Sequence, residues 1–279
     1  MRAKINKVVK ALLAMRPKIV RALKVCLIIV AFVGAAFAGG LAGGAIMVSD
    51  GGGPELTDLV RNWEATVAVR LPNDLRASGV IVSRQGHVLT CAHVITLAEG
   101  GEIHVDIEDG PLAKSYLAEV VAVDEEMDLG LLRISVNFPR PALIAEGDVP
   151  PYPGDEIYGV GYPSELGSIK TISRGSVRIL RYSAIGENVP LSAQDTLALY
   201  GRFENGYSGS GIYLQGDGRL AGLVSLELWT GRFPFWMRGT PLAIPASRFR
   251  PFLDQNGVVY NGPDASWWDT ISGLSVLFR

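Results

Sequence analysis

Three short segments of the sequence carry residue types that together could hydrolyse an acyl bond. The first is Thr90-Cys-Ala-His93, the second is an acidic turn that ends at Asp128, and the third is Gly206-Tyr-Ser208-Gly-Ser-Gly211. A serine hydroxyl is a weak nucleophile, so a neutral imidazole must take its proton and a carboxylate must orient that imidazole. Glycines around the serine leave room for two backbone N–H groups to face an oxyanion. The segments therefore predict serine acyl-transfer chemistry.

Two of these positions have rivals nearby in the sequence. Asp124 and Asp128 both belong to the acidic turn, but Asp128 directly precedes an apolar run that would bury it beside the imidazole. Ser210 lies between two glycines, but it has Ser208 rather than a glycine two positions earlier. Cys91 could be imagined as a thiol nucleophile, although we expect a small buried residue at a strand end. We favour Asp128 and Ser208 and keep the others as alternatives.

Short apolar runs, separated by turn signals, must position these residues. The runs are Thr66–Leu71, Ser78–Ser83, His87–Cys91, Glu102–Glu108, Leu117–Asp124, Leu129–Ile134, Glu156–Gly161, Thr171–Leu180, Thr196–Tyr200, Gly211–Leu214 and Leu220–Leu228. Helix-like stretches are few, namely Pro54–Trp63 and Ala246–Asp254. Many short strands at fairly even spacing predict an all-β barrel or sandwich.

In this order the motifs resemble those of trypsin-like serine proteases, in particular the bacterial HtrA/Deg type, over roughly residues 60–255. Arg174-Gly-Ser-Val177 also resembles the strand that opens the family's second barrel, and Gly239–Pro245 resembles a segment near its specificity pocket. The resemblance implies an all-β fold of two six-stranded antiparallel β-barrels, as in chymotrypsin.

The resemblance also implies a role for each residue of the candidate site. His93 would be the base, Asp128 the orienting carboxylate and Ser208 the nucleophile, and the N–H groups of Gly206 and Ser208 would form the oxyanion hole. One departure is Ser210, which stands where the family has a second glycine. A short tail, rather than a PDZ domain, is expected after the protease domain.

The resemblance determines substrate recognition less well. In this fold the residue six positions before the nucleophile often lines the primary pocket, and here it is Arg202. A cation there would favour an acidic substrate side chain, although this loop moves in HtrA-like enzymes. The strand segment Ser225, Leu226 and Glu227 should bind the substrate backbone by strand addition.

Charge divides the chain into a basic head and an acidic body. Of the 26 Lys and Arg residues, eight lie in residues 1–49, which contain no acidic residue, leaving 18 basic against 28 acidic residues in 50–279. A body this acidic is a poor nucleic-acid binder, because phosphate contacts need clustered Lys and Arg. No His/Cys cluster has metal-ligand spacing and no phosphate-binding loop is present, so we expect neither a metal nor a cofactor.

Val25–Val48 is an uncharged apolar run that follows the basic head. As a helix it would span about 36 Å, enough to cross a hydrocarbon core of about 30 Å. The positive-inside rule keeps the N-terminus cytoplasmic and sends the body across the membrane. The alternatives are a signal peptide cleaved near Ala36-Phe37-Ala38, giving a secreted protein, and an organellar targeting peptide.

We therefore expect a basic cytoplasmic segment (1–24), a transmembrane helix (25–48), a linker (49–58), a protease domain (59–256) and a C-terminal tail (257–279). The predicted function is a membrane-anchored serine endopeptidase that acts on proteins or peptides outside the cytoplasm. Small residues four apart in the helix, such as Gly39 and Gly43, also allow pairing into a homo-oligomer. The alternative function is an inactive protease-like binding or sensor module at the membrane surface.

Overall fold

The computed structural model describes residues 56–72, 75–107, 114–146, 151–164, 169–182, 195–227 and 240–261. The predicted basic segment 1–24, the predicted transmembrane helix 25–48 and most of the tail 257–279 lie outside these residues. In the part of the chain that the structure describes, no helix is long and apolar enough to cross a membrane.

The first half of the body is a sheet of seven antiparallel strands in the order β5-β4-β1-β2-β3-β7-β6. The strands are β1 (Thr66–Arg70), β2 (Arg76–Ile81), β3 (His87–Thr90), β4 (His104–Ile107), β5 (Lys114–Leu117), β6 (Glu119–Asp124) and β7 (Leu129–Arg133). Its two edge strands, β5 and β6, are consecutive in the chain and only Ala118 separates them. The chain therefore passes from the ladder of β4 into the ladder of β7, and the sheet curls into a half-barrel.

Our prediction of a closed six-stranded barrel in this half is wrong. The sequence indicates one strand over Leu117–Asp124, whereas the structure divides Lys114–Asp124 into two strands that pair with different neighbours. The backbone N–H of Ala118 donates to the Ile103 carbonyl at 2.9 Å, which fixes the bend. The two edge strands run on from each other and form no ladder together, so the sheet stays open.

The second half is a closed barrel of six strands in the order β10-β13-β12-β11-β8-β9, which confirms the prediction for this half. The strands are β8 (Glu156–Gly161), β9 (Thr171–Tyr182), β10 (Thr196–Gly201), β11 (Gly211–Leu214), β12 (Leu220–Glu227) and β13 (Pro241–Pro245). The barrel closes because β9 is long enough to pair with β8 along its first part and with β10 along its second. Its buried core includes Ile157, Leu199, Phe203 and Tyr207.

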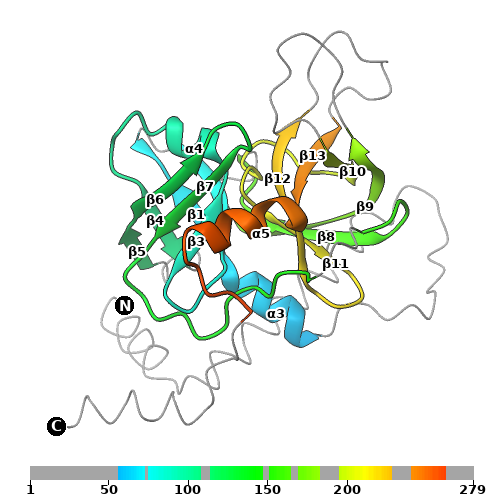
Figure 1. The fold of residues 1–279 in the computed structure, drawn as a ribbon, viewed down its shortest axis with the longest axis horizontal. Helices are drawn as coiled ribbons and strands as arrows, with labels where there is room; N and C mark the ends of the chain where they lie inside the picture. The colour runs from blue at the N-terminus through cyan, green and yellow to red at the C-terminus, as the bar shows by residue number, and fades with distance from the viewer. Residues whose placement is uncertain are drawn as a thin grey trace, which may run out of the picture. The chain divides into compact units, whose positions relative to one another are not determined.

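Three helices are described, and two of them join the halves. α3 (Leu56–Ala65) leads directly into β1, and its buried Asn62 side chain donates to the Tyr158 hydroxyl of β8 at 2.8 Å. α5 (Ala246–Gln255) follows β13 and buries Phe249 and Leu253, and its Arg248 side chain donates to Sδ of Met127, in the turn before β7, at 2.8 Å. In Figure 1, α5 crosses the front of the two sheets and α3 lies below them.

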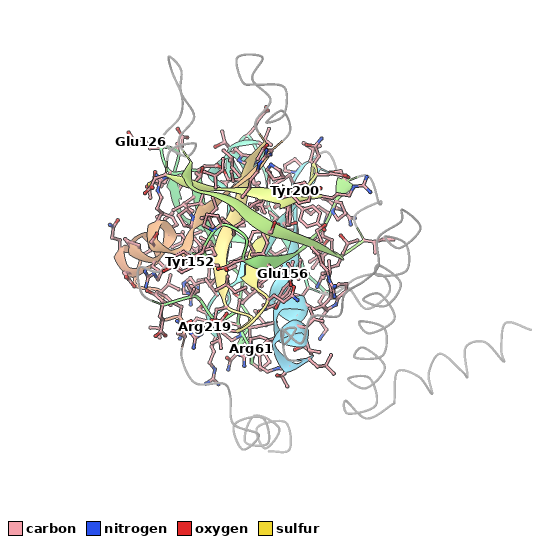
Figure 2. The ribbon with its side chains drawn as sticks, turned by 90° about the vertical axis from the view of Figure 1, so that its right-hand side faces the viewer. Arg61, Glu126, Tyr152, Glu156, Tyr200 and Arg219 are labelled. Atoms are coloured by element: carbon pink, nitrogen blue, oxygen red, sulfur yellow. The ribbon has the colours of Figure 1, made fainter. Side chains whose placement is uncertain are left out.

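The third helix, α4 (Ala92–Thr96), is a short helix that follows β3. It lies beside the turn between β6 and β7, which contains Glu126. Figure 2 shows Glu126 at one end of the body and Arg61 of α3 at the other. The candidate active site, which depends on α4 and this turn, therefore lies away from the supporting helix α3.

Candidate active site

His93 and Asp128 form a directly hydrogen-bonded pair. Nδ1 of His93, in α4, lies 2.9 Å from both Oδ1 and Oδ2 of Asp128, the residue just before β7. The backbone N–H of His93 also donates to Oδ1 at 2.9 Å, so the carboxylate fixes both the ring and the first turn of its helix. The His93 side chain is 41% exposed and that of Asp128 only 10%, so the imidazole is open to solvent while the carboxylate is enclosed.

Ser225, in β12, contributes a further hydrogen bond to this pair. Its hydroxyl donates to Oδ2 of Asp128 at 2.5 Å, across the boundary between the two halves of the body. Burial by itself raises the pKa of Asp128, but the hydrogen bonds and charge of His93 and the Ser225 hydroxyl outweigh it. The net effect lowers the pKa of Asp128, so the carboxylate is ionised at neutral pH.

Sequence reasoning placed Ser225 in the substrate-binding strand and missed this contact with Asp128. The signal available was a serine in an otherwise apolar run, Leu220–Leu226, where a buried hydroxyl needs a partner. The partner itself lies 97 residues away in the chain and could not be identified from spacing.

Cys91 lies beneath the His93–Asp128 pair. Its side chain is fully buried, and Sγ donates to the Val224 carbonyl at 3.2 Å. Burial, and next the charge of Asp128, raise the pKa of the thiol well above its ordinary value, so the sulfur stays protonated. Ligand atoms of Cys91, His93 and Asp128 lie within 4.8 Å of one another, a proximity that follows from the hydrogen-bonded pair with the thiol behind it.

The rival carboxylate Asp124 has a different environment. Its Oδ1 accepts a hydrogen bond from the backbone N–H of Met127 at 2.9 Å, closing the turn between β6 and β7. Asp128 ends the same turn with a φ of 54°, a left-handed conformation that is uncommon for a residue other than glycine. Asp124 therefore shapes the turn, and it is Asp128 that reaches the imidazole.

The loop that carries Ser208 is held by backbone contacts to the first half of the body and to β12. The N–H of Ser78, in β2, donates to the Ser208 carbonyl at 2.9 Å, and the N–H of Gly209 donates to the Val224 carbonyl at 2.8 Å. Gly209 has a φ of 82°, and a Cβ there would collide with the Ser78 carbonyl and with Thr90 Oγ1. Only glycine fits this position. The absence of a side chain lets the Ser208 loop approach the ends of the strands that precede His93.

Gly206 and Ser208 present backbone N–H groups that donate to no protein acceptor in the described part of the chain. The neighbouring N–H groups of Tyr207 and Ser210 are used, donating to the Glu204 and Tyr207 carbonyls at 3.0 and 2.7 Å. An oxyanion hole requires two backbone N–H groups that are free to donate, and here only one residue separates them in the chain. The Ser208 hydroxyl also makes no hydrogen bond within the described residues, including to His93; catalytic contacts of this kind often tighten only when substrate is bound.

The rival nucleophile Ser210 has a fully buried hydroxyl without a hydrogen-bond partner among the described residues. Ser208, by contrast, is half-buried. A nucleophile must reach the substrate, so the greater exposure of Ser208 favours it over the buried Ser210 as the nucleophile.

The predicted substrate-binding residues fall into two places. Arg202 directs its side chain into solvent, where it is 89% exposed and pairs with Glu204 at 3.2 Å, so an acidic substrate preference stays a prediction. The backbones of Leu226 and Glu227 are in β12, opposite Leu242 and Pro241 of β13. Strand addition along Ser225–Glu227 likewise stays a prediction.

The sequence profile of the trypsin-like peptidase domain family matches residues 77–223. The matched range contains His93, Asp128 and Ser208 and spans parts of both halves of the body.

Curated relatives with similar sequences are proteases by name, and two of the three described next are named serine proteases. The magnetosome formation protease MamE of Paramagnetospirillum magneticum is 29% identical over 181 residues, which are 64% of this chain and 24% of that protein. Serine protease HTRA1 of Xenopus tropicalis is 28% identical over 186 residues, 64% of this chain and 35% of that protein. Serine endoprotease DegS of Salmonella typhimurium is 28% identical over 205 residues, 72% of this chain and 54% of that protein. The chain thus spans between about a quarter and about half of these relatives.

Solved structures agree on the fold. The HtrA-type protease AlgW with a tripeptide superposes with a TM-score of 0.58 at 23% identity, covering 72% of this chain and 64% of AlgW. The serine endoprotease from Yersinia pestis gives a TM-score of 0.56 at 24% identity, covering 71% of this chain and 65% of that one. The fold is therefore all-β and chymotrypsin-like, and the chain belongs to the trypsin-like peptidase family, among relatives of the HtrA type.

Proposed function

We propose that this protein is a membrane-anchored serine endopeptidase that cleaves peptide bonds through His93, Asp128 and Ser208. The observation that carries the proposal is the pair in which both oxygens of Asp128 lie 2.9 Å from Nδ1 of a solvent-open His93. An enclosed, ionised carboxylate on Nδ1 leaves Nε2 as the free acceptor, which is the tautomer a general base needs.

In the first half-reaction, Ser208 Oγ attacks the substrate carbonyl carbon while His93 Nε2 takes the hydroxyl proton. The charge that develops on the carbonyl oxygen is stabilised by the N–H groups of Gly206 and Ser208, which donate to no acceptor among the residues that the structure describes. The tetrahedral intermediate then breaks its C–N bond, His93 gives the proton to the leaving amine, and an ester to Ser208 remains.

In the second half-reaction, water takes the place of the amine. His93 removes a proton from the water as it attacks the ester carbonyl, and returns that proton to Ser208 Oγ when the acid product leaves. Throughout, the Ser225 hydroxyl and the backbone N–H of His93 keep Asp128 oriented toward the imidazole.

Peptide or protein substrates would bind as an added strand along Ser225–Glu227, supplying backbone hydrogen bonds that are independent of side-chain identity. This mode supports extended, unfolded substrates. Solved structures of the HtrA-type protease AlgW with a decapeptide and with a tripeptide support a peptide substrate.

The proposed anchor is Val25–Val48, with the basic head in the cytoplasm and the protease domain on the other side of the membrane, in the periplasm or at the cell exterior. Retention in the membrane after alkaline carbonate extraction, with the body digestible by protease added to the outside, would support this topology. Release of a shortened chain into the soluble fraction would instead support a cleaved signal peptide.

Activity is tested by incubating the detergent-solubilised full-length chain with fluorescently labelled, unfolded casein. We expect the wild type to cleave casein and Ser208→Ala to lose about a millionfold of the rate, the size seen when the nucleophile of a serine protease is removed. Ser210→Ala is the matched control, because its hydroxyl has no hydrogen-bond partner among the described residues, and it should cleave at the wild-type rate.

Equal cleavage by wild type and Ser208→Ala would overturn the assignment of the nucleophile. A folded wild type that neither cleaves casein nor reacts with a fluorophosphonate would favour the alternative, an inactive protease-like binding or sensor module. Size-exclusion chromatography of the same sample would show whether copies of the chain pair.

A further inference from the structure

Ser78 is a fully buried polar residue in β2 that takes no part in the chemistry described above. Its partner in β1 is Ala68, in an otherwise apolar part of the ladder. A hydroxyl at such a position is costly unless it is hydrogen-bonded, so its partners indicate what it does.

All three polar atoms of Ser78 are bonded, and two of them contact the Ser208 loop of the second half directly. Its N–H donates to the Ser208 carbonyl at 2.9 Å, and its Oγ donates to the Gly206 carbonyl at 2.7 Å. Oγ in turn accepts a hydrogen bond from the N–H of Tyr162 at 3.0 Å. The Ser78 carbonyl accepts from Thr90 Oγ1 at 2.8 Å, which completes the set.

The contact with Gly206 matters because a glycine with a φ of 93° has unusually free neighbouring peptide planes. The peptide before Gly206 is fixed by a hydrogen bond of 2.8 Å from Ser164 N–H to the Asn205 carbonyl. The peptide after Gly206 is held at its carbonyl by Ser78 Oγ and at its N–H by the hydrogen bond of 3.0 Å from Tyr207 to the Glu204 carbonyl. With both planes held, the Gly206 N–H keeps one direction before substrate arrives.

We infer that Ser78 is a positioning residue that preforms the oxyanion hole, acting through the Gly206 carbonyl rather than on the substrate. The inference rests on the proposed function of Gly206 and Ser208. It adds that the first half of the body, through one side chain in β2, determines whether the loop of the second half is ready for catalysis.

The variant that tests this inference is Ser78→Ala, which leaves the Gly206 carbonyl without its donor. Misdirecting an oxyanion donor costs less than removing it, for which about 100- to 1000-fold is typical. We therefore expect kcat on a casein-derived peptide cut by the wild type to fall about 10- to 100-fold, with KM unchanged within about twofold. Binding of a boronic acid built on that peptide, which mimics the tetrahedral oxyanion, should weaken by the same factor as kcat.

Ser210→Ala is the matched control, since it removes another fully buried serine hydroxyl from the same region, one without a hydrogen-bond partner in the part of the chain that the structure describes. It should leave kcat and boronic acid binding unchanged. Ser78→Cys retains a weaker donor of similar size and should give an intermediate kcat. If Ser78→Ala does not fold, the kcat and the boronic acid binding of Ser78→Cys test the inference in its place.

The inference is overturned if the variants at Ser78 keep the wild-type kcat, or if they raise KM while boronic acid binding stays unchanged. A fall in kcat of the same size in Ser210→Ala would also overturn it, because the effect would then follow from losing any buried hydroxyl. Failure of the proposed function is distinguishable, because the wild type would then cut no peptide before any Ser78 variant is compared.

Discussion

The two halves of the body hold their parts of the candidate site in different ways. His93 and Asp128, which belong to the half-barrel, are fixed mainly through the Asp128 side chain, whose carboxylate bonds to the ring and backbone N–H of His93 and accepts from the Ser225 hydroxyl of the closed barrel. The Ser208 loop, which belongs to the closed barrel, is fixed mainly through its own backbone groups, by contacts to β12 and to Ser78 of the first half, with glycines at the positions of closest approach. Substitutions at His93 and Asp128 should therefore lower the reaction rate without altering the fold, whereas substitutions at the glycines of the Ser208 loop should alter the conformation of that loop.

The largest effect is expected for Asp128→Asn, which keeps the size of the side chain and removes its charge. The imidazole would adopt the wrong tautomer, and in serine proteases this change lowers kcat by about 10,000-fold. The fall in kcat is measured by the rate at which the folded variant cleaves casein. Asp124→Asn is the control, because the amide oxygen can still accept from Met127 N–H, and it should stay within about threefold of wild type.

A smaller loss in Asp128→Asn, equal to that of Asp124→Asn, would mean that the His93–Asp128 pair supports the fold and not the chemistry. The two halves would then no longer differ in the way described.

The next largest effect is expected for Gly209→Ala, which should distort the Ser208 loop and destabilise the fold. A left-handed alanine costs about 1–2 kcal/mol, and its Cβ would also collide with the Ser78 carbonyl, so a total of at least about 2 kcal/mol is expected. For a body of this size that corresponds to a fall in Tm of roughly 4–8 °C, measured by thermal unfolding, together with loss of cleavage. Gly216→Ala, at a position with open space and no left-handed φ, should change neither. An equal Tm shift in both variants would contradict the role given to Gly209.

Lowering the pH should reduce the free energy of unfolding, because Asp128 then becomes protonated. Its pKa lies below the usual value in the folded protein, so its contribution to stability is complete above the unfolded pKa of about 3.9 and is lost as the pH falls through the folded value. Urea unfolding between pH 7 and pH 3 measures this loss. Ser225→Ala removes a hydrogen bond to the carboxylate and should move the loss to higher pH. An unchanged pH profile in Ser225→Ala would show that this bond does not stabilise the charge.

The smallest effect is expected for Cys91→Ala. The thiol stays protonated because burial raises its pKa, and it contacts the Val224 carbonyl instead of solvent. Casein cleavage should stay within about twofold of wild type, and iodoacetamide should not modify Cys91 in the folded protein of a Cys26→Ala background. A tenfold or greater loss of activity would show that the thiol takes part in the reaction.

Sequence reasoning identified most strands, because apolar runs separated by turn residues are a local signal. It missed β13, whose two prolines, Pro241 and Pro245, are unusual within a strand, and α4, which is only one turn long. It also gave the first sheet the wrong closure. Whether Lys114–Asp124 pairs as one strand or two depends on which neighbours it meets, and that is decided by the tertiary fold.

The sequence also predicted which segments form the candidate site better than it predicted the hydrogen bonds between them. His93 and Asp128 lie together, as the family resemblance implied. The contacts of Ser225 and Ser78 were not foreseen, since each joins residues about 100 or more positions apart across the two halves. A buried serine in an apolar strand is a usable warning that such a partner exists, although the sequence does not name it.

The most direct test of the account is to locate the product of a fluorophosphonate reaction by mass spectrometry. In the folded full-length protein we expect a single phosphonyl adduct on Ser208, absent from His93→Ala because the hydroxyl then loses its base. An adduct on Ser210, or labelling of Ser208 that proceeds equally well without His93, would contradict the proposed catalytic site.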